Sequence, residues 1–267
     1  MLREKLEKLA KDPRFISGIY NYCDRWCERC GFTKRCMNYA LDADDSGKRE
    51  TLDINNKEFW DKLHEIFSET LEMVKEDAKK MGIDLDSIDY EEAARLDEQI
   101  HKVIEEQPHI RAAMKYIEMT EAWFESNKKV LEEKAGELVT LVNADIPGAR
   151  PDVEAVNIKD CIYVIRWYQH FIYVKLCRAA SGMIRGEFEE IEYCPEDANG
   201  SAKVAIIGIE RSIAGWGRLM KYFSSQEDSI LKILAKLQSL LRQSEEAFPD
   251  ARAFKRPGFD TEPDGKQ

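Results

Sequence analysis

Four of the seven cysteines stand close together in the run YCDRWCERCGFTKRC, at Cys23, Cys27, Cys30 and Cys36. Their C-x3-C-x2-C-x5-C spacing lets four thiolates converge with little loop entropy to overcome, and thiolates are preferred ligands of zinc and of iron–sulfur clusters. Charged residues lie between the cysteines, which opposes their burial as four simple apolar side chains. The spacing therefore predicts a metal centre.

The interval between the last two cysteines helps to distinguish a zinc site from an iron–sulfur cluster. Structural zinc sites usually combine two C-x2-4-C pairs separated by a longer loop, whereas only five residues separate Cys30 from Cys36. One compact wrap of chain favours a [4Fe-4S] cluster, and zinc is the alternative. Four cysteine ligands leave no iron open to a substrate, so we expect a structural or electron-transfer role, with a redox or other protein partner of unknown identity.

The segment CERCGFTKRC resembles the C-x2-C-x5-C end of the [4Fe-4S] loops in helix-hairpin-helix DNA glycosylases and in some cluster-containing recombination nucleases. This resemblance covers about ten residues and implies only a ligand role for Cys27, Cys30 and Cys36. The spacing to Cys23 differs and no glycosylase motif is present, so DNA repair is not implied. Cys23, Cys27 and Cys30 also match the motif of radical S-adenosylmethionine enzymes, but the chain lacks the strand alternation of their β/α barrel.

A second candidate site follows from helix-bundle dimetal oxidases, which draw Glu from two helices and Glu-x-x-His from two others. Only one Glu-x-x-His is present, and a solvated pair is its simpler interpretation. Arg166, within an apolar segment, needs a partner there, so we expect either a buried Arg166–Glu210 pair steadied by His170 or a ligand pocket. The candidate residues of this second site are Glu98, His101, Glu121, His170 and Glu210.

The polar run DADDSGKRETLD matches positions 1, 3, 5, 6 and 12 of an EF-hand calcium loop: Asp42, Asp44, Ser46 and Asp53 stand at ligand positions and Gly47 at the glycine of the turn. Its eighth position, normally apolar, is Arg49, and its last ligand is Asp instead of a bidentate Glu. A polar turn is the better interpretation. The sequence shows no P-loop, dinucleotide fingerprint, G-x-S-x-G or H-E-x-x-H motif, which removes the commonest nucleotide and hydrolase hypotheses.

Helical periodicity runs through most of the chain, and strand-like alternation is nearly absent. We expect an all-α fold: a small cysteine-bound module at 1–55, a bundle of about five long helices at 56–248, and a disordered tail at 249–267. Pro108 either kinks or splits one helix. The segment from Val153 to Ile184 is apolar around most of its circumference, which places it at the bundle centre.

The formal net charge of -11 gives no support to nucleic-acid binding, because phosphate recognition normally shows as an excess of Lys and Arg. No uninterrupted apolar run reaches the length of a membrane span, and the start MLREKLEKLAKD has no signal-peptide core. We therefore expect no membrane association and a cytoplasmic protein, in which clustered cysteines bind metal instead of forming disulfides.

Overall fold

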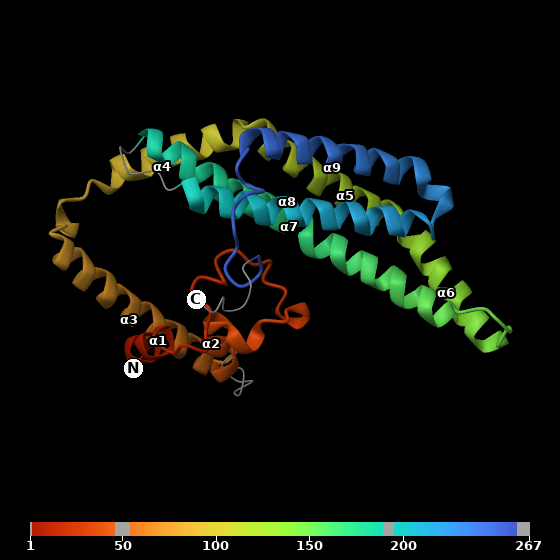
Figure 1. The fold of residues 1–267 in the computed structure, drawn as a ribbon, viewed down its shortest axis with the longest axis horizontal. Helices are drawn as coiled ribbons and strands as arrows, with labels where there is room; N and C mark the ends of the chain where they lie inside the picture. The colour runs from red at the N-terminus through yellow and green to blue at the C-terminus, as the bar shows by residue number, and fades with distance from the viewer. Residues whose placement is uncertain (1, 46–53, 189–194, 261–267) are drawn as a thin grey trace, which may run out of the picture. The chain divides into compact units, whose positions relative to one another are not determined.

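The computed structural model describes residues 2–45, 54–188 and 195–260, and these residues form nine α-helices and no strand (Figure 1). The all-α prediction is confirmed, but the helices are more numerous than the five expected. Some are short, and Pro108 splits one predicted helix by taking the first position of the next. The helices are α1 (Leu2–Ala10), α2 (Met37–Asp45), α3 (Lys57–Met81), α4 (Tyr90–Glu106), α5 (Pro108–Ser126), α6 (Lys128–Ala144), α7 (Pro151–Phe188), α8 (Pro195–Met220) and α9 (Glu227–Ala247).

The chain divides into two compact units. The first, which we call the N-terminal unit, comprises Met1–Asp97 together with Lys255–Gln267. The second, the bundle unit, comprises Glu98–Phe254. This division differs from the predicted boundaries, because α3 belongs with the cysteine-containing segment and so does the end of the chain.

Helix α7 forms the centre of the bundle unit, as its apolar circumference predicts. It packs along α8 and also contacts α5 and α6, while α9 packs on α5 and α8. Its buried side chains recur every three or four residues along one face of the helix. They include Ile165, Tyr168, Ile172 and Leu176, each with no exposed surface.

Helix α8 is buried along most of its length, and exposed residues such as Glu210 and Arg211 lie on one side of it. One face carries only small buried residues at spacings of four and three, namely Ser201, Ala205, Gly208, Ser212 and Gly215. A Cβ atom on Gly208 would lie 3.0 Å from Cδ1 of Tyr168 on α7. The small side chains therefore allow the backbones of α7 and α8 to approach closely.

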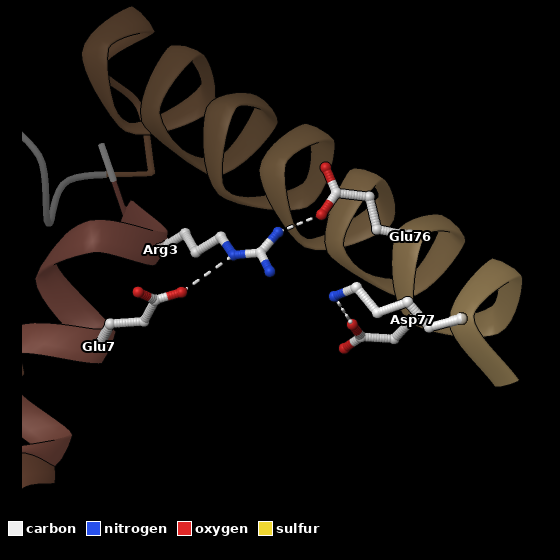
Figure 2. A network of polar contacts seen from close by, with 5 residues as sticks. Arg3, Glu7, Glu76 and Asp77 are labelled. Atoms are coloured by element: carbon white, nitrogen blue, oxygen red, sulfur yellow. Dashed lines mark hydrogen bonds and ion pairs between the residues drawn. The ribbon is translucent and has the colours of Figure 1, made fainter.

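The N-terminal unit contains little apolar core. Among its described residues, the only buried apolar side chains are those of Ile19 and Ala78. Helix α3 begins at the N-cap Asn56, whose side chain accepts a hydrogen bond from the Glu58 backbone N–H, and ends at Gly82 with φ +73°. Helix α1 contacts α3, and Figure 2 shows an ion pair between Arg3 of α1 and Glu76 of α3.

Residues 249–260 have a described structure where the sequence predicts a disordered tail from residue 249 onward. Ala251 is fully buried, and Lys203 Nζ donates a hydrogen bond of 2.6 Å to the Phe254 carbonyl oxygen. Arg256 and Asp260 form a half-buried ion pair of 3.0 Å. These contacts order a segment whose composition alone resembles a tail; residues 261–267 lie outside the described residues.

The predicted polar turn at 42–55 is partly helical, because α2 extends to Asp45. Three residues of the possible calcium loop, Ser46, Gly47 and Asp53, lie outside the described residues, as does Cys194. In the described parts of the chain, no helix is long and apolar enough to cross a membrane.

Candidate metal centre

Short turns carry the four clustered cysteines. Cys27 opens a 3₁₀ turn at Cys27–Arg29, and a second 3₁₀ turn at Thr33–Arg35 leads directly into Cys36. Arg25 has φ +58°, a left-handed conformation that is uncommon for a residue with a side chain. The chain therefore changes direction several times between Cys23 and Cys36.

All four cysteines line one pocket, as their spacing predicts. The empty volume of this pocket is about 320 Å³, a figure that includes part of the open solvent at its mouth. Each of the four cysteines is half-buried. Aromatic side chains complete the wall, including those of Tyr20, Trp26, Phe32 and Tyr39. As placed among the described residues, no three His, Cys, Asp or Glu side chains form a group that could hold a single metal ion.

Backbone N–H groups are directed at two of the sulfur atoms. The Phe32 N–H donates to Cys30 Sγ with a donor–acceptor distance of 3.4 Å. Burial raises the pKa of the Cys23 thiol, and the Arg25 backbone N–H opposes this rise by hydrogen bonding to the sulfur. In both cases the donor lies two residues after the cysteine. Such donors stabilise a thiolate, which is the form that binds metal.

Other features of the pocket disfavour the charged, thiolate form of the cysteines. Burial raises the pKa of Cys27, and the nearby charges of Cys23, Cys36 and Cys30 raise it further. Several thiolates at short range repel one another unless a cation lies among them. The raised pKa values therefore favour neutral thiols at Cys23 and Cys27, and a cation among the four sulfurs would favour the thiolates instead.

The end of the described chain closes one side of this pocket. Phe259 lines it and meets the ring of Phe32 edge to face, with 5.0 Å between ring centroids. Gly258, at φ +76°, lets the segment lie against Ile16 and Ile19, because a Cβ atom there would be 2.8 Å from Ile19 Cδ1. Sequence reasoning missed Phe259, since a contact across more than two hundred residues leaves no local pattern.

The structure does not bring the five residues of the second candidate site together. His170 Nε2 lies 3.5 Å from Glu121 Oε1, and both side chains are more than half exposed. Glu98 forms an ion pair of 2.7 Å with Lys102, and His101 is exposed. An exposed pair of one carboxylate and one imidazole is an ordinary surface contact.

The predicted buried Arg166–Glu210 pair is wrong. Glu210 is exposed and lies 2.8 Å from Arg252, while Arg166 lies over the Phe124 ring at 4.0 Å and donates to Gln169 Oε1 at 3.2 Å. The apolar pattern of the two helices misled the prediction, because each helix also has a narrow solvent-facing side on which these charges lie. His170 does not join Arg166 to Glu210.

No known family, curated protein or solved structure matches the chain. The cysteine pocket is therefore interpreted from its own chemistry.

Proposed function

We propose that the chain binds a [4Fe-4S] cluster through Cys23, Cys27, Cys30 and Cys36, and that the cluster holds the N-terminal unit together. One observation carries this proposal: four cysteines surround one pocket in a unit whose described residues bury only two apolar side chains. A unit with so little core needs another source of stability, and a metal centre supplies it by coupling ligand binding to folding.

The spacing of the cysteines supports a cluster over zinc. Each thiolate of a cubane binds a different iron, so its four sulfurs stand farther apart than four ligands of one zinc ion. A short loop with a five-residue last interval suits such a centre better than two separated zinc-binding pairs do. Zinc binding by a protein without catalytic activity is the alternative that the experiment below must exclude.

The surroundings of the sulfurs supply the properties that a bound cluster needs. The backbone N–H groups of Arg25 and Phe32 donate to the sulfurs of Cys23 and Cys30, and such hydrogen bonds stabilise thiolates and shift the reduction potential of iron–sulfur centres. Trp26, Phe32 and Phe259 contribute apolar surface to the wall of the pocket. When bound, the cluster would also supply a one-electron redox centre, so electron transfer to a protein partner is compatible with the same site.

The residues in the bundle unit give no support to a catalytic alternative. Of the five candidates there, only Glu121 and His170 meet, and their side chains are more than half exposed. An oxidoreductase site of the dimetal type needs carboxylates and imidazoles that converge in the bundle interior.

The proposal is tested on protein purified without oxygen, by measuring iron, sulfide and zinc per chain together with the visible absorption spectrum. We expect about four irons with sulfide and a broad band near 400 nm, the usual signature of thiolate-bound clusters. Cys27→Ser should lose most of the iron and the band, and protease should then cleave residues 12–36 faster.

Cys177→Ser is the matched control, because Cys177 is also half-buried but lies on α7 in the bundle unit. It should keep the iron content and the protease resistance of the unchanged chain. A colourless protein with one zinc per chain would show that the cysteines bind zinc and not an iron–sulfur cluster. Neither metal in the anaerobic protein, or equal iron loss in both variants, would refute a centre at these cysteines.

A further inference from the structure

Helix α3 of the N-terminal unit exposes a continuous apolar stripe. Residues at spacings of seven carry large side chains that are half or more exposed: Trp60 at 56%, Phe67 at 64%, Val74 at 51% and Met81 at 75%. A second row, four residues after each of the first three, contains His64, Leu71 and Ala78. The two rows match the d and a positions of a heptad repeat, the pattern of a coiled-coil seam.

The packing of α1 leaves this stripe open. Arg3 of α1 pairs with Glu76, as Figure 2 shows. With 3.6 residues per turn, Glu76 lies about 140° around α3 from Leu71. Ala78 alone in the two rows is buried; it lies near the helix end, where the Ile83 N–H bonds to the Ala78 carbonyl oxygen at 2.9 Å. Helix α1 thus approaches a different side of α3.

We infer that α3 pairs with α3 of a second copy of this chain, in antiparallel orientation. The sizes of the seam residues are self-complementary in one such register. When Leu71 lies beside Phe67 of the second copy, His64 lies beside Val74, so each of these large residues meets a smaller one. In a parallel pair, each residue would instead face its own copy, which stacks Trp60 on Trp60 and His64 on His64.

Charge complementarity selects the same orientation. Asp61 and Lys75 each follow a d residue and flank the seam on the same side. In the antiparallel register, Asp61 of each copy faces Lys75 of the other, which gives two opposite-charge pairs, and Ser68 faces Ser68 at the centre. A parallel pair separates Asp61 from Lys75 by almost four helical turns, so no such pairing forms.

The oligomeric state of the full chain, purified without oxygen, tests the stripe. We expect a concentration-dependent dimer by sedimentation equilibrium. Leu71→Glu should weaken the dimer roughly a hundredfold, because it places two carboxylates in the seam. The exposed position of Leu71 means that the folded single chain tolerates the change, which helicity by circular dichroism checks. Glu65→Lys, on another side of α3, is the control and should leave the dimer unchanged.

Two charge reversals test the orientation. Asp61→Lys and Lys75→Asp each create two like-charge pairs, so each variant alone should dimerise roughly tenfold more weakly. An equimolar mixture of the two variants restores both opposite-charge pairs, and its dimer should regain the affinity of the unchanged chain. A monomer at all concentrations, a dimer indifferent to Leu71→Glu, or a mixture no tighter than the single variants would overturn the inference.

Discussion

Substitution of Gly208 by Ala tests the close packing of α7 on α8. The new Cβ atom would lie 3.0 Å from Tyr168 Cδ1 and 3.2 Å from Ile172 Cγ1. The Tyr168 ring has little freedom to move, because it is fully buried and its hydroxyl oxygen accepts a hydrogen bond from Arg211. Overpacking of this kind costs about 1–3 kcal/mol, against a helix-propensity gain of about 1 kcal/mol for Gly→Ala.

Gly136→Ala is the control for this prediction. Gly136 lies in the middle of α6, and a Cβ atom there meets nothing within 4 Å, so only the propensity gain applies. We expect Gly136→Ala to stabilise the chain by about 0.5–1 kcal/mol and Gly208→Ala to be about 1–3 kcal/mol less stable than that variant. Urea unfolding followed by circular dichroism measures both free energies. Equal effects of the two substitutions would refute the close approach of the helices.

Two further predictions concern the N-terminal unit and His109. Gly258→Ala should increase amide hydrogen exchange around Ile19, because the new Cβ atom would press on that side chain. Gly82→Ala has the same left-handed backbone but no neighbour within 4 Å, so it should leave this exchange unchanged. Equal exchange around Ile19 in the two variants would contradict the packing of Gly258 on Ile19. Burial lowers the pKa of His109 to about 4, so the unfolded chain takes up a proton at pH values where the folded chain does not. The contribution of neutral His109 to the free energy of unfolding should therefore be fully present above about pH 6.5, and up to about 3 kcal/mol of it should be lost as the pH drops to 4. His109→Gln should remove most of this loss. A variant with the same pH dependence of stability as the unchanged chain would contradict the prediction.

The sequence predicts local features of this fold well. The apolar circumference of 153–184 predicts the central place of α7, and Pro108 predicts the break between α4 and α5, because both signals lie within the segments that they describe. The convergence of the four cysteines on one pocket was also accessible, since their spacing alone limits how far apart they lie.

Long-range contacts were not predictable in the same way. The small-residue face of α8 is visible in the sequence only after Tyr168 and Ile172 are known to lie against it. The prediction of the Arg166–Glu210 pair was wrong for a similar reason. Hydrophobic periodicity shows that the polar side of a helix is narrow, but it does not show which charged residue of another helix lies beside that side. Phe259 reached the cysteine pocket from a segment whose composition favours disorder.

The position of Phe259 in the cysteine pocket also affects how the protein is made. A ribosome adding about 5–20 residues per second needs roughly 10–45 seconds to proceed from Cys36 to Phe259. For most of that interval the four thiols are outside the ribosome without the aromatic ring that lines their pocket in the folded unit. Under the proposed metal binding, the cysteines can therefore be loaded at an open site, before the segment that carries Phe259 is synthesised.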